Sequence, residues 1–288
     1  MKIAVIDLDS IAFTIGHPNK QLDANGNPIR TDDNSKFLYI DKTDQELIDA
    51  ADNVMSAIIM KGGFTHYIGF IKGNKTIAER KEINIDYKAN RNKESPGWWA
   101  FVKKTLIERW NAISVDNMEV DDAVNITRLK LSDSYIVAMD KDLLYLHGTH
   151  YNWSKDEWNI IGFEEAYIKF WSDMITGQSG DNIKGIPKKG AKYVENMLLE
   201  QTKVPFRTRV FDEYIKHFGE YEGIKEFHKN YSCLKIKETC EGFEIPSPIQ
   251  FERDNINEQA QRDKQIDSIQ EEGKEFYSSN VGDSNFSI

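Results

Sequence analysis

A short apolar run at the start of the chain constrains the fold more than any other feature. Residues 2–8 are almost continuously apolar and end beside aspartate, a pattern typical of a strand buried on both faces of a parallel sheet. The stretch TDQE, which begins at Thr43, has the form of a capping box, and apolar residues then recur at helical spacing until Gly62 and Gly63 end the predicted helix. A second apolar strand is predicted at 65–71. Strand, helix and strand in this order predict an α/β fold.

The rest of the chain continues this alternation of helices and strands. Residues 16–36 are rich in Gly, Asn, Asp and Pro and predict a long loop. Further predicted elements are helices at 98–110, 120–131 and 163–175, a strand at 134–140 and a hairpin at 149–163. The region 177–240 predicts short helices joined by loops. From Pro246 onward the apolar content falls and the charge rises, which predicts a disordered tail.

The composition is that of an ordinary water-soluble globular chain. Hydrophobic residues make up 40% and charged residues 29% of it. No apolar run approaches the roughly 20 residues that cross a bilayer, and the first residues lack the pattern of a signal peptide, so we expect no membrane association. The two cysteines, Cys233 and Cys240, are not spaced like the ligands of a metal site. So few cysteines favour a reduced protein in the cytoplasm. If the chain is encoded by a phage, this would be the cytoplasm of the host.

The distribution of charge matters more than its sum. The formal net charge is −10, which by itself argues against a protein that binds nucleic acid. However, the tail beyond Pro246 holds much of the excess of acidic residues, so the charge of the remaining chain is less negative. Bases outnumber acids between residues 72 and 93, and four lysines without an acid lie between 184 and 192. These stretches are either solvated surface or contacts for phosphate groups.

Acidic residues follow the predicted strands and begin a predicted helix. Singly, each has a simpler interpretation as a turn, a helix cap or a charge that complements a helix dipole. Together they are expected at one sheet edge, because the carboxyl ends of parallel strands converge there. Such a cluster suits hard divalent cations, and two of them can activate water and orient a phosphodiester. The residues are Asp7, Asp9, Glu119, Asp121, Asp122, Asp140, Asp142 and Asp181.

The stretch TGQSGDNIKGIPKKGAK, residues 176–192, is the most specific segment of the chain. Glycine turns around Gly185 and Gly190 separate short predicted helical pieces, and lysines lie between them. Exposed backbone N–H groups at helix starts bind phosphate, and lysines add positive charge. The segment therefore predicts a grip on the backbone of nucleic acid, the alternative being a flexible loop.

Five ordered motifs resemble those of the 5′-nuclease (flap endonuclease) family, particularly the bacteriophage 5′-exonucleases. They are VIDLDS at 5–10, DYKANR at 86–91, MEVDDAV at 118–124, AMDKDLL at 138–144 and SGDNIKGIPKKGAK at 179–192. The resemblance spans roughly residues 1–240. It implies a PIN-like α/β core with a central, mostly parallel sheet flanked by helices at 1–175, a helical arch near 80–110, and a helical DNA-binding region at 176–245. The acidic tail, 246–288, would lie outside these regions.

Transferred onto this sequence, the family pattern implies roles for individual residues. One Mg²⁺ or Mn²⁺ ion would be held by Asp7, Glu119, Asp121, Asp122 and Asp140, and a second by Asp142 and Asp181. Lys88 and Arg91 would contact the scissile phosphate, and their spacing would place them on one face of a helix. Tyr87 is implied in DNA binding, although it could instead pack inside the arch. The other residues implied in DNA binding belong to a helix–three-turn–helix, a motif that in the family often holds K⁺. They are Lys184, Gly185, Lys188, Lys189, Gly190 and Lys192.

The chain also departs from the family pattern in two acids. No acidic residue occurs at 69–75, where the family places an aspartate after its second strand. Gln178 stands three residues before Asp181, where the family has another aspartate. We therefore expect one of the two metal sites to be weakened.

The resemblance implies a divalent-metal-dependent 5′-3′ exonuclease and flap endonuclease that acts on 5′ ends of DNA, and on RNA–DNA hybrids, in replication or repair, including primer removal. We expect a monomer, with the tail available to a replication protein. One alternative is a catalytically weakened, structure-specific DNA-binding protein of the same fold. A second is a haloacid-dehalogenase-like phosphatase, since DLDS fits the Asp-x-Asp with which those enzymes open; Asp7 would then be the nucleophile.

Overall fold

The computed structural model describes residues 1–91, 96–200 and 202–251. The chain divides into two units, Met1–Ile249 and Gln250–Ile288. The elements discussed below lie in the first unit, except that the short strand β11 (Ile249–Gln250) ends at the first residue of the second. Most of the predicted disordered tail, residues 252–288, falls outside the described residues.

The first strand forms the centre of a mostly parallel sheet, as predicted. β1 (Ile3–Asp7) pairs in parallel with β4 (His66–Lys72) on one side and with β6 (Ser134–Val137) on the other. β5 (Ile113–Val115) extends β4 in parallel; β7 (Gly148–Asn152) follows β6 and forms the predicted hairpin with β8 (Glu157–Ile161). Every residue of β1 is buried, which explains its unbroken apolar run. The predicted fold class is confirmed.

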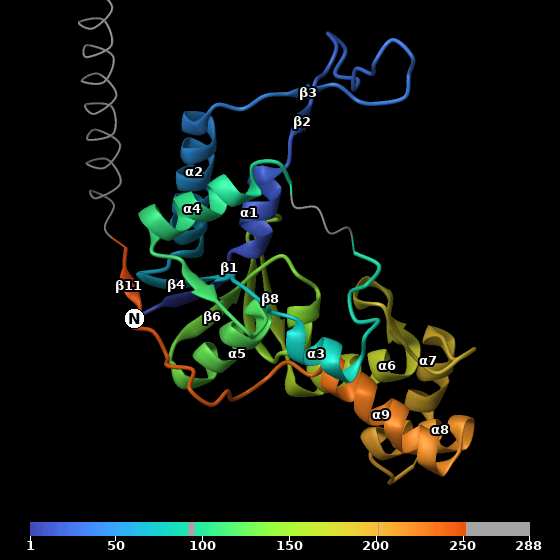
Figure 1. The fold of residues 1–288 in the computed structure, drawn as a ribbon. Coiled ribbons are helices and arrows are strands. Elements are labelled where there is room, and N and C mark those ends of the chain that lie inside the picture. Colours follow the sequence, from blue (N-terminus) through green and yellow to red (C-terminus); the bar gives the residue numbers. More distant parts are fainter. Residues whose placement is uncertain (92–95, 201, 252–288) are drawn as a thin grey trace, which may run out of the picture. The chain divides into compact units, whose positions relative to one another are not determined.

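Helices cover the sheet (Figure 1). α1 (Asp9–Gly16), α2 (Asp44–Gly62) and α4 (Trp99–Trp110) contact one another, and α5 (Val120–Lys130) packs on β1, β4 and β6. The α5 interface is a core of aliphatic and aromatic side chains that includes Val5, Phe70, Val120 and Val124. Within the part of the chain that is described, no helix combines the length and apolar character that a bilayer span requires.

A second core joins the helices of the C-terminal half. It lies among α6 (Phe163–Thr176), α7 (Ala191–Leu199), α8 (Phe206–Phe218) and α9 (Glu220–Leu234). Residues 177–184, predicted as helical pieces, instead form a small ladder of β9 (Gly177–Gln178) and β10 (Ile183–Lys184) around the 3-10 turn η2 (Ser179–Asp181). A second 3-10 turn, η1 (Asp142–Tyr145), follows β6.

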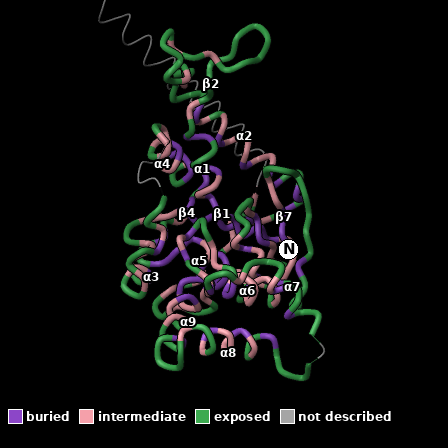
Figure 2. Tube along the Cα trace, turned by 90° about the vertical axis from the view of Figure 1, so that its right-hand side faces the viewer, coloured by how far each residue is buried: buried purple, intermediate pink, exposed green. Residues whose placement is uncertain are grey.

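Three other segments differ from their predictions. The strand predicted at 134–140 ends at Val137, and the loop predicted at 16–36 belongs to an exposed hairpin closed by β2 (Asn19–Lys20) and β3 (Tyr39–Ile40), green in Figure 2. The helix expected around Lys88 and Arg91 was wrong: α3 (Ala78–Ile83) ends earlier, and turns follow. Lys88 itself has a left-handed φ of 53°, which a helix cannot contain.

The capping box at the start of α2 gives a direct test of the sequence–structure link. Glu46 N–H donates to Thr43 Oγ1, and Thr43 N–H donates to the Glu46 carboxylate. Thr43→Ala should lower the free energy of unfolding by about 1 kcal/mol, measured by urea denaturation. Thr43→Ser keeps the hydroxyl and should retain the wild-type value; an equal loss in both variants would contradict a capping role.

Candidate metal centre and the basic segment beside it

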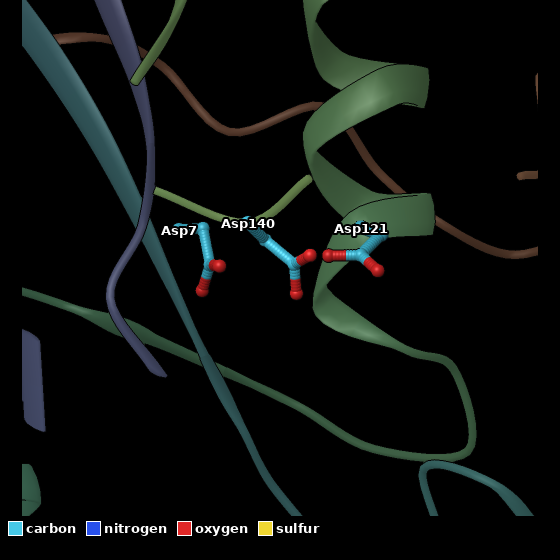
Figure 3. A group of neighbouring side chains, drawn as sticks. All are labelled: Asp7, Asp121 and Asp140. Carbon is cyan, nitrogen blue, oxygen red and sulfur yellow. The ribbon is translucent and has the colours of Figure 1, made fainter. Parts of the chain in front are cut away.

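Three carboxylates from separate elements converge at the carboxyl edge of the sheet (Figure 3). Asp7 ends β1, Asp140 lies in the loop after β6, and Asp121 lies in the first turn of α5. One oxygen of each lies within 4.8 Å of the others. The parallel pairing of β1 and β6 brings the two strand ends together, as expected for this kind of sheet. Asp7, Asp121 and Asp140 are called the carboxylate triad below.

The triad has no positive partner of its own. Among the described residues, no lysine or arginine forms an ion pair with any of the three. Burial, with the neighbouring Asp9 and Asp140 charges, raises the pKa of Asp7 from an ordinary 3.8 to about 8. Burial, then the charges of Asp140 and Asp7, also raises the pKa of Asp121. Because carboxylate oxygens are the ligands that hard divalent cations prefer, a bound divalent ion would remove this repulsion. The donor set therefore fits such an ion.

Glu119 and Asp122, also predicted to hold the first metal, are neutralised by the chain's own cations. Arg80 Nη1 pairs with Glu119, and Arg80 Nη2 lies 2.9 Å from Asp122 Oδ1. Lys88 Nζ also pairs with Glu119. Burial alone would raise the pKa of Glu119, but Lys88 and Arg80 outweigh it and hold that pKa below its ordinary value. The structure thus does not bring Glu119 or Asp122 into the triad.

The residues predicted for a second metal are joined by an amide. Gln178 Nε2 donates to Asp142 Oδ1 at 2.8 Å, and Gln178 Oε1 accepts from the Asp181 N–H at 2.6 Å. Asp181 further pairs with Arg91 at 2.5 Å and lies 3.6 Å from Lys88. Where the family pattern has a third acid, this chain has a neutral side chain that uses both its donor and its acceptor internally.

The turn that follows α3 places three predicted residues against the acids. Lys88 N–H donates to the Asp181 carbonyl, and the Tyr87 hydroxyl donates to Glu119 Oε2 at 2.8 Å and Asp181 Oδ2 at 3.0 Å. Lys88 and Arg91 therefore share a target despite the absence of a helix. The Tyr87 ring is only 1% exposed, so in this conformation it packs inside the protein and offers no face to a base.

Two residues of this region have contacts that their local sequence does not indicate. Arg80 is one of several bases between residues 72 and 93, and nothing in its local pattern indicates a buried position between two acids. For Asp9 the sequence leaves open a turn or a contact that supports the site; its Oδ1 accepts the Lys72 N–H at 2.8 Å, and its own N–H donates to Asp7 Oδ1 at 2.9 Å. Asp9 thus ties the end of β4, which lacks an acid, to the start of α1.

The predicted phosphate-binding segment approaches the end of α6 closely. A Cβ on Gly185 would lie 2.1 Å from the Ile175 carbonyl oxygen, so only glycine fits there. Lys189 is turned inward, where it pairs with Glu213 and donates to the Tyr193 hydroxyl at 3.0 Å. Gly190 is exposed at the start of α7, and so are the remaining predicted lysines, Lys184, Lys188 and Lys192.

Comparisons with known proteins agree with the motifs. No family model matches the chain. A 5′-3′ exonuclease of Mycoplasmopsis pulmonis (strain UAB CTIP) is 31% identical to this chain over 140 residues. The match covers 41% of this chain and 46% of that protein, so the chain spans about half the length of this curated relative. The structure of T5 5′-exonuclease with bound zinc aligns with a TM-score of 0.51 and 13% identity, covering 82% of this chain and 100% of that one. A T5 protein co-crystallised with metal ions gives the same values. The chain therefore resembles the 5′-nuclease family and shares the fold of the T5 enzyme.

The raised pKa values of Asp7 and Asp121 in the triad, and of Asp142, predict how stability depends on pH. A group whose pKa is raised by folding stabilises the fold at low pH and loses that contribution as the pH rises through the folded value. Asp7 and Asp142, at about 8 and about 6, have this sign, as does Asp121. Between pH 5 and pH 8 the Tm of metal-free protein should therefore fall, by on the order of a few degrees.

The same thermal scans contain their own control. Asp7→Asn removes the titrating group and should flatten the fall in Tm between pH 5 and pH 8. Added Mn²⁺ should raise the Tm of the wild type more at pH 8, where protons no longer compete for the oxygens. A Tm that rises with pH in metal-free wild-type protein would contradict this account of the triad.

Proposed function

We propose that this protein is a divalent-metal-dependent 5′-3′ exonuclease and flap endonuclease that hydrolyses DNA phosphodiester bonds. The observation that carries the proposal is the carboxylate triad, which forms no ion pair among the described residues and lies at the sheet edge near the half-buried Lys88. The likeness to a protein named 5′-3′ exonuclease and to the fold of T5 5′-exonuclease supports it. RNA–DNA hybrids, and a part in replication or repair such as primer removal, are included in the proposal.

The triad would hold the ion, which we propose to be Mg²⁺ or Mn²⁺. When bound, such an ion lowers the pKa of a water ligand and polarises a phosphate oxygen. Asp7, Asp121 and Asp140 would supply its oxygen ligands. The Asp9 N–H donates to Asp7 Oδ1, and this hydrogen bond would fix the orientation of the Asp7 carboxylate.

Lys88 and Arg91 would bind and stabilise the reacting phosphate. In the structure Lys88 forms ion pairs with Glu119 and Asp181, and Arg91 forms one with Asp181. A phosphate beside the triad would offer negative charge of the same kind, so these cations would exchange a carboxylate partner for a phosphate. Their charge would then offset the negative charge that grows on the phosphate in the transition state.

The exposed lysines of the glycine-rich segment would hold the duplex. Lys184, Lys188 and Lys192 lie at the surface around the start of α7, and lysines so placed bind phosphates without reading bases. A K⁺ ion at this segment belongs to the same proposal.

A specific observation keeps a second candidate function in view. Gln178 joins Asp142 to Asp181, and Arg91 already pairs with Asp181, so a second ion would have to displace protein groups. A chain that binds DNA in this way with weak cleavage would be a structure-specific DNA-binding protein. Cleavage of a flap substrate labelled at its 5′ end distinguishes the two functions.

The first prediction for this function concerns Asp140, the most exposed member of the triad. Asp140→Asn should lower the rate of flap cleavage by more than about a hundredfold, because it removes a charged ligand, while binding of the flap in EDTA stays at the wild-type level. Asp49→Asn on the outer face of α2 is the matched control and should cleave normally. Persistence of full activity in Asp140→Asn would exclude the triad as the catalytic centre.

The second prediction concerns Gln178. Gln178→Asp should add a second divalent ion per chain, because a carboxylate replaces the amide between Asp142 and Asp181. Titration calorimetry with Mn²⁺ should give one strong site in the wild type and two in the variant. Gln178→Ala, which removes the amide without adding charge, is the control. Two strong sites already present in the wild type would show that Gln178 does not weaken the second site.

A further inference from the structure

The outer side of the β7–β8 hairpin has no role in the functions above. β8 is the last strand at its end of the sheet, and among the described residues it pairs only with β7. Alternate residues of an antiparallel strand direct their N–H and C=O groups away from the partner strand. The free side of β8 therefore offers a row of donors and acceptors that no described strand uses. This backbone, with the exposed side chains of residues 157–165, is called the β8 edge.

The sequence of β8 does not protect this edge. Natural edge strands are commonly blocked by a lysine, a proline or a bulge. The five residues of β8 read EWNII and contain neither lysine nor proline. Their pairing with β7 is regular from Glu157 to Ile161, so there is no bulge. The first four residues are exposed, and the edge thus remains open to a further strand.

Exposed apolar side chains accompany the free backbone. Ile160 is 81% exposed, and Phe163, at the start of α6, is 74% exposed. Trp158 lies on the same face of β8 as Ile160 and is 40% exposed. The Phe163 ring stacks on the His147 ring, with the centroids 3.6 Å apart. An added strand would cover apolar area that is now in water, which favours its binding.

The edge is held firmly against the sheet. The Trp158 ring packs on the rings of Tyr151 and Tyr135, with centroids 4.8 Å and 5.8 Å away. Lys2 Nζ lies 4.4 Å from the centroid of the same ring. These contacts fix β8 before any partner arrives, so little of the binding free energy is lost in ordering it.

The charge along the edge selects the kind of partner. Residues 153–165 contain four acids and one lysine. One acid, Asp156, already pairs with Lys61. The other three are exposed and form no ion pair within the described part of the chain, although the charge of Glu165 also acts on the buried His150. They are Glu157, Glu164 and Glu165. A basic partner complements them.

The same acids disfavour a second copy of this chain as the occupant. Antiparallel pairing of two β8 strands would bring Glu157 of each copy toward Glu164 and Glu165 of the other. Like charges placed together in this way oppose association, and each chain carries a net charge of −10.

We propose that the β8 edge binds an extended, basic segment of another protein, which adds a strand to the sheet beside β8. Its apolar side chains would lie against Trp158 and Ile160, and its lysines or arginines against Glu157 and the acids at the start of α6. This interaction goes beyond the nuclease function proposed above and does not depend on it.

Fluorescence anisotropy with a designed peptide tests the edge. The probe is a labelled heptapeptide, Lys-Ile-Lys-Val-Lys-Ile-Lys, and the same peptide with glutamate for lysine should not bind. Ile160→Lys should weaken binding by about tenfold or more, because it removes an apolar contact and adds a repulsive charge. Ile160→Thr keeps a β-branched residue and should also weaken binding, so it serves if Ile160→Lys does not fold. Tyr221→Lys, at a side chain that is 80% exposed on α9, is the matched control.

Charge reversal tests the acids separately. Glu164→Lys with Glu165→Lys should weaken binding of the lysine peptide by about fivefold at low salt, and the difference should shrink at high salt, because exposed charge pairs are screened. Asp32→Lys with Asp41→Lys changes the net charge equally at exposed positions elsewhere and should leave binding unchanged.

N-methylated peptides test whether the partner pairs as a strand. Methylation of every second amide removes the donors on one side of the peptide, so one of the two methylated registers should bind at least about tenfold more weakly. Full binding by both registers would overturn strand addition. Unchanged affinity in Ile160→Lys, or no binding of the lysine peptide to the wild type, would overturn the site.

Two further measurements separate this proposal from other readings of the edge. Light scattering should find the wild type monomeric, and a dimer that Ile160→Lys dissociates would assign the edge to a second copy and overturn a foreign partner. Ile160→Lys should cleave a flap substrate at the wild-type rate. Absence of cleavage in the wild type would overturn the nuclease function, while the peptide data would still decide the role of the β8 edge.

Discussion

The parallel pairing of β1 with β6 is the constraint on which the candidate site depends. It brings Asp7 and the loop that carries Asp140 to one edge of the sheet, and α5, packed on the same strands, adds Asp121. The cost of this geometry is electrostatic, since three acids share a small, partly buried volume. The apolar contacts of β1 and α5 hold them there.

The chain balances several acids near the triad from within. Arg80, Lys88 and Arg91 neutralise Glu119, Asp122 and Asp181, whereas among the described residues the three triad acids form no ion pair. This division distinguishes acids that the fold itself uses from acids that favour a bound ion. It also gives Lys88 and Arg91 carboxylate partners within the protein.

Much of the fold could be predicted from local patterns, because periodicity and caps depend on neighbouring residues. The buried run of β1 and the capping box at Thr43 are examples, and Asp7 and Asp140 could be placed because parallel strands end at one edge, whereas Asp121 could be placed only at the start of a helix. The left-handed φ of Lys88 and the burial of Arg80 could not be predicted, since both depend on acids from α5 and η2 that are distant in sequence. The bond between Asp9 and Lys72 likewise depends on which strands are neighbours. The residue-level roles carried over from the family remain predictions.

Arg80 and Asp122 also fasten the segment that follows α9 to the site. Arg80 Nη2 donates to the Lys235 carbonyl at 3.0 Å, the Lys237 N–H donates to Asp122 Oδ1 at 2.8 Å, and Ile236 lies in the core between them. The end of α9 is therefore not the boundary of the folded body. A shortened gene that stopped at Leu234 would remove the backbone groups that Arg80 and Asp122 bind, whereas one that retained the chain to Ile245 would keep them, together with the Phe243 and Ile245 side chains that pack on the same core.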